Sequence, residues 1–278
     1  MNTGYQFLGE EVAGNGPPLV HIVKVPVELS TSYMKGAADA PDAILEASRQ
    51  IELYNPLLDL DLEGKGILTL DPGVDSKKGL FSFLDEERER LRSTFTCFIG
   101  GEHSITPWIL EGMRYGDIGI VWLDAHADLR KEYLGDPESH ACAARNSLAY
   151  GELVEIGVRS FSSGEKAFMT EEHRVRVHTT WNKDAMKAID RLPDKVYVSL
   201  DFDSIDPSVL RAVGTPEPGG LSWQDLMDIF DHVFSSKKVV GMDAVELCPF
   251  PDDEASNFIA AKAVYEAVSR AIGMEASS

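Results

Sequence analysis

Short apolar segments alternate with amphipathic segments along most of this chain. The apolar segments are rich in β-branched residues and are mainly apolar instead of alternating, and they cover residues 19–25, 66–70, 95–100, 118–124, 152–158, 195–201 and 238–246. This pattern is typical of strands that are buried on both faces of a sheet. The segments between them predict helices, among them residues 38–54, 84–93, 104–115, 183–192 and 222–234.

Strands that alternate with helices along a chain form parallel β-α-β units with right-handed crossovers. We therefore predict the α/β class, with a three-layer α/β/α fold around a mainly parallel central sheet. No low-complexity linker and no fixed-period repeat divides the sequence, so one domain is expected over residues 1–278. The pattern leaves the register of residues 55–95 open.

The composition excludes several classes of partner. A chain of 278 residues with 44% hydrophobic content can bury a sizeable core. Its formal net charge of -20 and its lack of any Lys/Arg-rich run argue against nucleic acid, which needs a basic surface. No stretch approaches the roughly 20 apolar residues of a membrane span. Residues 1–18 have neither a basic start nor a long apolar run, so no secretory signal is expected.

The cysteines indicate a compartment. The chain has three cysteines, an odd number, and they lie far apart in the sequence. No two of them have the spacing of metal ligands. Such usage suits reduced thiols better than a disulfide framework. A cytoplasmic protein is therefore expected.

Acidic residues and histidines gather where predicted strands end. Residues 100–104 read GGEHS, residues 124–128 read DAHAD, residues 201–203 read DFD, and Glu246 ends the strand at 238–246. In open α/β sheets, ligand sites lie beyond the carboxyl ends of the strands. A single Asp at a strand end is usually a turn former or a helix cap. The convergence of four such ends favours a functional site instead.

The spacing within these clusters suits metal ligands. Alternate side chains of an extended segment project to one side, which would group the acidic and histidine residues of DAHAD and of DFD. The glycine pair before the histidine of GGEHS permits close backbone approach. Burying several carboxylates together is costly without cations, so the sequence predicts a two-metal site. The predicted ligands are His103, Asp124, His126, Asp128, Asp201 and Asp203.

The ligand types indicate the metal and the reaction. Imidazole and carboxylate ligands without thiolate favour Mn(II) and leave Fe, Co, Ni or Zn open. Two metals about 3.5 to 4 Å apart lower the pKa of a bridging water toward neutrality, so hydrolysis by hydroxide is predicted. In the structural alternative, His103 begins a helix, DAHAD is a surface loop and DFDSIDP is a capping turn. The joint occurrence of the three clusters on successive strand ends favours the metal site.

These motifs resemble the ureohydrolase family of arginases and agmatinases, and they are most similar to those of agmatinases. The resemblance covers nearly the whole chain, with further marks at residues 30–48, 139–145, 155–160, 199–208, 214–223 and 241–249. It implies the arginase-like fold, two Mn(II) ions per subunit, and hydrolysis of a guanidino group to urea and an amine. It also implies a homo-oligomer, either a trimer or a hexamer.

The resemblance further implies how the matched ligands divide between the metals. One metal would be held by His103, Asp124, Asp128 and Asp201, and the other by Asp124, His126, Asp201 and Asp203. Asp124 and Asp201 would then bridge the two ions. A hydroxide held between the metals and oriented by Asp128 would attack the guanidinium carbon, and the tetrahedral intermediate would collapse to urea.

Two further residues would act on the substrate. Glu246 matches the carboxylate that binds the guanidinium, and its alternative is a structural strand-end residue. His140 matches a histidine that moves protons to the departing amine, a role that suits a group with a pKa near neutrality. Its alternative is a loop histidine without a partner. Ala141 stands where many relatives have glycine, which leaves the shape of this loop open.

The far end of the substrate is less determined. Thr215 and Glu217, in the GTPEPGG segment, either reach the substrate or only shape a turn. Arginases typically carry Asn where this chain has Arg130, and a Ser-Gly-Asn run where it has residues 137–139, so their anchors for an α-carboxylate are missing. We therefore predict a small cationic guanidino substrate, agmatine, converted to putrescine and urea. Arg130 could itself pair with a carboxylate, which keeps arginase, guanidinobutyrase and formiminoglutamase activities open.

Other classes of function fit the sequence less well. A non-catalytic binding subunit with a ureohydrolase fold would lack metal ligands, and all of them are present. A dinucleotide-binding oxidoreductase would need a G-x-G-x-x-G motif after its first strand, which is absent. A two-metal phosphoesterase would need basic residues for phosphate, and the clusters offer only Arg130 and Lys131.

Overall fold

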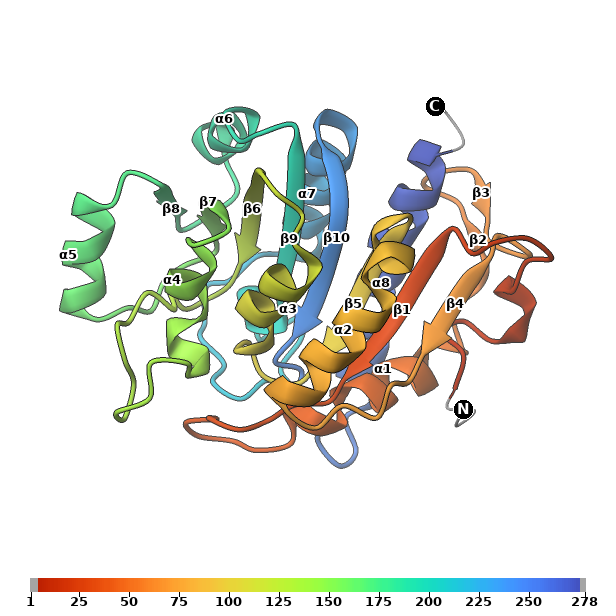
Figure 1. Cartoon of the computed structure of the whole chain (residues 1–278), viewed down its shortest axis with the longest axis horizontal. Coiled ribbons are helices and arrows are strands. Elements are labelled where there is room, and N and C mark those ends of the chain that lie inside the picture. Colours follow the sequence, from red (N-terminus) through yellow and green to blue (C-terminus); the bar gives the residue numbers. More distant parts are fainter. Residues whose placement is uncertain (1–4, 276–278) are drawn as a thin grey trace.

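A computed structural model describes residues 5–275 and contains an eight-stranded sheet in which every strand pairing is parallel. The strand order is β4-β1-β5-β10-β9-β6-β7-β8, seen from right to left in Figure 1. The strands are β1 Val20–Val25, β4 Ile67–Leu70, β5 Phe95–Gly100, β6 Ile118–Leu123, β7 Gly151–Ile156, β8 Val175–His178, β9 Lys195–Asp201 and β10 Lys238–Val245. The predicted α/β class with a mainly parallel sheet is confirmed.

Helices cover both faces of the sheet. In Figure 1, α2 and α3 lie in front of the strands, and α7 and α8 lie behind them. The front layer packs on one core cluster and comprises α2 Lys77–Arg92, α3 Ile105–Met113, α4 Ala143–Ser147 and α5 Ser163–Glu171. The rear layer packs on a second cluster and comprises α1 Ala40–Ser48, α6 Lys183–Asp190, α7 Trp223–Ser236 and α8 Glu254–Glu275. The central strands are mainly apolar because each of their faces lies in a core.

Short elements complete the described chain. They are the 3-10 helices η1 Glu10–Val12, η2 Ala37–Asp39, η3 His140–Cys142 and η4 Phe202–Ser204, and the antiparallel pair β2 Tyr54–Asn55 and β3 Leu60–Asp61. Within residues 5–275, no helix combines the length and apolar character needed to cross a membrane. Residues 1–4 and 276–278 of the predicted domain lie outside the described range.

Several predicted elements have different boundaries. The helix predicted at 38–54 ends at Ser48, because the chain then turns into the β2-β3 pair. The helix predicted at 84–93 begins at Lys77, where the Ser76 hydroxyl accepts a hydrogen bond from the Gly79 N–H and caps the first turn. The pattern did not predict β8, α5 or α8. Helix α8 is buried on almost all sides over residues 260–272, so it lacks the polar face by which a helix is recognised.

The strand order places four strand ends together. β5 and β6 are consecutive among the sheet strands in sequence, yet β10 and β9 lie between them in the sheet. The carboxyl ends of β5, β10, β9 and β6 therefore sit side by side at one edge, where the strand order reverses. Open α/β sheets bind ligands at such an edge.

Candidate active site

Four of the predicted site residues stand at the carboxyl ends of these neighbouring strands: His103 comes after β5, Asp124 after β6, Asp201 ends β9 and Glu246 comes after β10. Close backbone packing makes this arrangement possible. A β-carbon on Gly101 would lie 2.2 Å from the carbonyl oxygen of Val27, so only glycine fits there. The glycine pair before His103 thus has the role that the sequence predicted for it.

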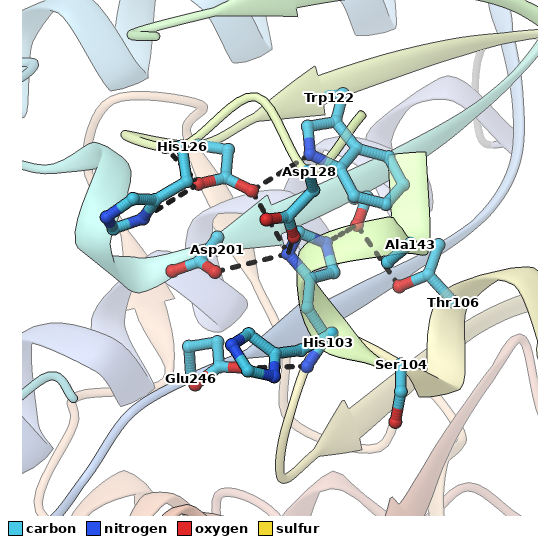
Figure 2. A network of polar contacts seen from close by, with 12 residues as sticks. His103, Ser104, Thr106, Trp122, His126, Asp128, Ala143, Asp201 and Glu246 are labelled. Atoms are coloured by element: carbon cyan, nitrogen blue, oxygen red, sulfur yellow. Dashed lines mark hydrogen bonds and ion pairs between the residues drawn. The ribbon is translucent and has the colours of Figure 1, made fainter. Parts of the chain in front are cut away.

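His103 lies at the centre of the cluster (Figure 2). Its Nδ1 is 3.1 Å from Asp201 Oδ2 and 3.2 Å from Asp124 Oδ2. Asp128 Oδ2 lies 3.6 Å from the same nitrogen. The imidazole is buried and stacks on the Trp122 ring, with 4.1 Å between the ring centroids. Within residues 5–275 this Nδ1 makes no hydrogen bond. A buried nitrogen without a partner, next to three carboxylates, is the arrangement expected when all four groups bind a cation.

His126 joins the cluster from the other side. Its Nδ1 lies 2.8 Å from Asp203 Oδ2 and 3.7 Å from Asp124 Oδ1. Two groups of three ligand atoms, each within 4.8 Å of one another, could hold a metal ion: His103, Asp124 and Asp128, and Asp124, His126 and Asp203. Asp124 belongs to both groups. The residues present therefore fit two adjacent cations.

The backbone reaches this arrangement differently from the prediction. Asp128 and Glu246 have φ of 48° and 65°, in the left-handed region. Asp203 lies in η4, and its N–H donates to Asp201 Oδ1 at 2.7 Å. The prediction that residues 124–128 and 201–203 are extended ligand segments is therefore wrong at Asp128 and at Asp203. A left-handed non-glycine residue costs about 1 to 3 kcal/mol, which the surrounding structure must offset.

The electrostatics of the cluster favour the binding of positive charge. Burial raises the pKa of Asp128 and of Asp201 well above the ordinary value, and the neighbouring carboxylates add to this rise. Burial alone would lower the pKa of His126, but the Asp203 carboxylate beside it raises that pKa to about 12. Such shifts arise when carboxylates are crowded together away from water. Divalent cations would stabilise the charged carboxylates.

A cavity of about 280 Å³ opens onto the cluster. Its wall includes Glu246, whose Oε1 accepts a hydrogen bond of 2.7 Å from the His103 N–H. The Oε2 atom makes no hydrogen bond to any residue in the described part of the chain. Burial raises the pKa of Glu246 to about 8, so a cationic group in the cavity would stabilise its charged form.

His140 also lines this cavity. Its Nδ1 lies 3.0 Å from the Ser30 hydroxyl, so the alternative of a loop histidine without a partner is wrong. Burial lowers the pKa of His140 below its ordinary value. Ala141 is also on the wall and has no positive φ, so the backbone at this position does not require glycine.

The residues predicted for the far end of the substrate fall into two groups. Arg130 and Thr215 line the cavity, and the Arg130 Nε lies 3.8 Å from Glu165 Oε2. The Arg130 guanidinium also lies over the Tyr133 ring, 5.3 Å from its centroid. Glu217 is not on the cavity wall. Its carbonyl oxygen instead accepts two hydrogen bonds from Arg159, of 2.7 and 3.2 Å.

Arg159 is a residue that sequence reasoning did not single out. Besides the Glu217 carbonyl, its guanidinium donates to the carbonyl oxygens of Gly157 at 2.8 Å, Asp203 at 2.8 Å and Ser204 at 3.3 Å. Hydrogen bonds from Arg159 therefore connect the loop that carries Asp203 to the GTPEPGG loop at residues 214–220. In the sequence, the only feature that marked Arg159 was its place in residues 155–160, one of the segments that resemble the ureohydrolase family.

Known proteins are similar to this chain in sequence and in fold. The sequence model of the Arginase family matches residues 19–269. The chain belongs to the arginase family. It is 34% identical over 264 residues to the N(1)-aminopropylagmatine ureohydrolase of Thermus thermophilus, covering 90% of this chain and 89% of that protein. It is 33% identical over 258 residues to an agmatinase of Pyrococcus horikoshii, covering 88% and 89%.

A solved structure agrees with this assignment. The agmatine ureohydrolase of Thermoplasma volcanium superposes with a TM-score of 0.82 at 28% identity, over 96% of this chain and 94% of that one. The predicted resemblance is confirmed, and so is a hydrolase of the agmatinase-like kind. The family is metal-dependent, which agrees with the two ligand groups in this arginase-family chain.

Proposed function

We propose that this arginase-family chain is an agmatinase-type guanidino hydrolase, which converts agmatine and water to putrescine and urea. The observation that carries the proposal is the position of Glu246. Its half-buried carboxylate shares one cavity with Asp128, Asp201 and Asp203, so a guanidinium held by Glu246 lies beside the ligand cluster. The names of the relatives support a substrate of this class.

The cluster would hold two divalent ions, and its nitrogen and oxygen donors favour Mn(II). His103, Asp124, Asp128 and Asp201 would hold one ion, and Asp124, His126, Asp201 and Asp203 the other. When bound, two such ions supply a water that is acidic enough to act as hydroxide near neutral pH.

The other groups bind the substrate and move protons. Glu246 would bind the guanidinium by charge-assisted hydrogen bonds from its Oε2, while the His103 N–H holds its Oε1 in place. Asp128, on the cavity wall, would orient the attacking water. His140, on the same wall, would give a proton to the amine nitrogen as its bond to carbon breaks.

Arg130 supports a second candidate substrate. Its side chain is 39% exposed and lines the cavity, so it would attract a carboxylate at the far end of a guanidino acid. The same positive charge would oppose the terminal ammonium of agmatine. 4-Guanidinobutyrate is therefore the alternative that the structure favours, and an Arg130→Gln variant should shift the preference from the acid toward the amine.

The experiment is a substrate panel. Purified protein loaded with Mn(II) is assayed for urea release from agmatine, N(1)-aminopropylagmatine, 4-guanidinobutyrate and arginine. We expect the highest kcat/KM with agmatine and much less urea from arginine. If 4-guanidinobutyrate has the highest kcat/KM, it replaces agmatine as the proposed substrate. If no guanidino compound releases urea, the assignment of the protein as an enzyme is overturned.

We further propose that residues 1–278 form one ureohydrolase domain, and that the protein is a cytoplasmic homo-oligomer, a trimer or a hexamer. Light scattering coupled to size-exclusion chromatography would give the subunit number. A monomeric mass would contradict this proposal.

A further inference from the structure

The hydroxyl of Ser30 lies between His140 and a buried carboxylate. Ser30 Oγ is 3.0 Å from His140 Nδ1 and 3.0 Å from Glu102 Oε1. The His140 main-chain N–H also donates to this oxygen, at 3.0 Å. Three polar groups that are far apart in the sequence thus meet at one hydroxyl.

The carboxylate sets the direction of these hydrogen bonds. Glu102 is fully buried, and its Oε2 accepts from the main-chain N–H groups of Leu29 at 2.7 Å and Ser30 at 2.6 Å. Its Oε1 accepts from the hydroxyl groups of Ser104 at 2.5 Å and Ser30 at 3.0 Å. Glu102 is the acceptor in all four of these hydrogen bonds, so the single hydroxyl proton of Ser30 points to Glu102.

The Ser30 oxygen is then an acceptor toward His140. A serine hydroxyl has two lone pairs, and the main-chain N–H and the Nδ1 of His140 use both. The neutral imidazole therefore carries its proton on Nδ1. Its other nitrogen, Nε2, accepts no hydrogen bond from residues 5–275 and keeps its lone pair, on a side chain that lines the cavity.

We propose that Ser30 is a positioning residue that fixes this tautomer, so that Nε2 is the nitrogen that carries protons. The proposal rests on the role of His140 in the proposed function. Nε2 accepts a proton from water at the cavity and becomes N–H. That proton then moves to the amine nitrogen as the C–N bond breaks, and the ring returns to its neutral Nδ1–H form.

A second serine makes the contribution of Ser30 testable. Ser139 Oγ lies 3.3 Å from His140 Nδ1 and makes no other hydrogen bond within residues 5–275. Without the Ser30 hydroxyl, that of Ser139 is free to donate to Nδ1. The ring proton would then move to Nε2, and the nitrogen that must accept a proton would be blocked.

The test combines a spectroscopic readout with kinetics. Long-range proton-nitrogen NMR of metal-free protein labelled with nitrogen-15 histidine reports the tautomer, with the His140 signals assigned through a His140→Gln variant. At about pH 8, where the imidazole is neutral, we expect Nδ1–H in the wild type, in Ser30→Thr and in Ser139→Ala. We expect Nε2–H in Ser30→Ala.

The kinetics should follow the tautomer. Ser30→Ala should lower kcat about 10- to 100-fold with little change in KM or metal content, and Ser30→Thr should restore it. Adding Ser139→Ala to Ser30→Ala should recover part of the lost kcat, because it removes the competing donor. A purely structural defect would worsen in that double variant.

Either readout can overturn the inference. Nε2–H in the wild type, or Nδ1–H unchanged in Ser30→Ala, contradicts the tautomer assignment even if no guanidino substrate is hydrolysed. An active enzyme whose kcat is insensitive to Ser30→Ala contradicts the positioning role. Absence of urea from the whole panel, with the expected tautomers, would instead count against the proposed function alone.

Discussion

The Nε2 of His103 lies 2.8 Å from the Ser199 hydroxyl, on the side of the ring away from the carboxylate cluster. Ser199 itself donates to Asp243 Oδ1 at 2.7 Å, so its oxygen accepts the Nε2–H of His103. Asp243 also accepts from the Tyr197 hydroxyl at 2.9 Å. This buried chain leaves the lone pair of Nδ1 directed at the carboxylates. Such outer contacts orient histidine ligands and set their tautomer.

Replacing Ser199 with Ala should therefore weaken metal binding. We expect a loss of about 10- to 100-fold in Mn(II) affinity, because the imidazole loses the contact that orients it. Isothermal titration calorimetry of metal-free protein measures the affinity. Ser269→Ala is the matched control, because Ser269 is equally buried but donates to the Tyr265 carbonyl in α8. Equal affinity in both variants would show that Ser199 does not support the ligand.

Asp124 and Glu246 should separate metal binding from turnover. Asp124 belongs to both ligand groups, so Asp124→Asn should lose both metals and all measurable activity. Glu246→Gln should keep the metals and lower kcat about 100-fold or more, because it removes charge next to the reacting group. Metal content by mass spectrometry and urea release decide the outcome. The exposed Asp184→Asn should resemble the wild type, and metal loss in Glu246→Gln would contradict its assignment as a substrate ligand.

Arg159 should be required for the shape of the site. Arg159→Lys keeps the charge but cannot reach the carbonyls of Gly157, Asp203, Ser204 and Glu217 together. Unpaired buried carbonyls should lower the free energy of unfolding by about 2 kcal/mol and weaken metal binding. Urea denaturation and metal titration measure the two effects. The control is Arg174→Lys, on an arginine whose side chain is 52% exposed, and equal behaviour of the two variants would disprove a special role.

His21 should make stability depend on pH. Burial, helped by the Arg90 charge, lowers its pKa from 6.5 to about 4, and its Nε2 is buried without a hydrogen bond. Between these values the unfolded chain binds a proton that the folded chain does not, so the free energy of unfolding falls as pH decreases. The fall should be on the order of 2 kcal/mol and should end below about pH 4.

Urea denaturation at about pH 7 and pH 4.5 tests this prediction. His21→Gln should show a smaller decrease than the wild type, whereas His173→Gln, at an exposed position, should show the same decrease. Equal decreases in His21→Gln and the wild type would mean that another group controls the acid sensitivity.

The sequence predicted the strands better than the helices. Strands such as β5 and β6 lie between two cores and are apolar at nearly every position, which leaves a clear local signal. The boundaries of α1 depend on what the chain meets next, and α8 lacks an exposed polar face. Neither feature is visible in the local pattern.

The order of residues determined which groups gather at the strand ends, because ligand chemistry and strand periodicity are local properties. Only the tertiary structure decided how they gather. The left-handed turns at Asp128 and Glu246 and the 3-10 turn at Asp203 depend on backbone packing across strands that are far apart in the sequence. The contacts of Ser199, Arg159 and Ser30 likewise join residues 44 to 110 positions apart. Hydrogen bonds of this kind are set by distance in space, so no local pattern in the chain could predict them.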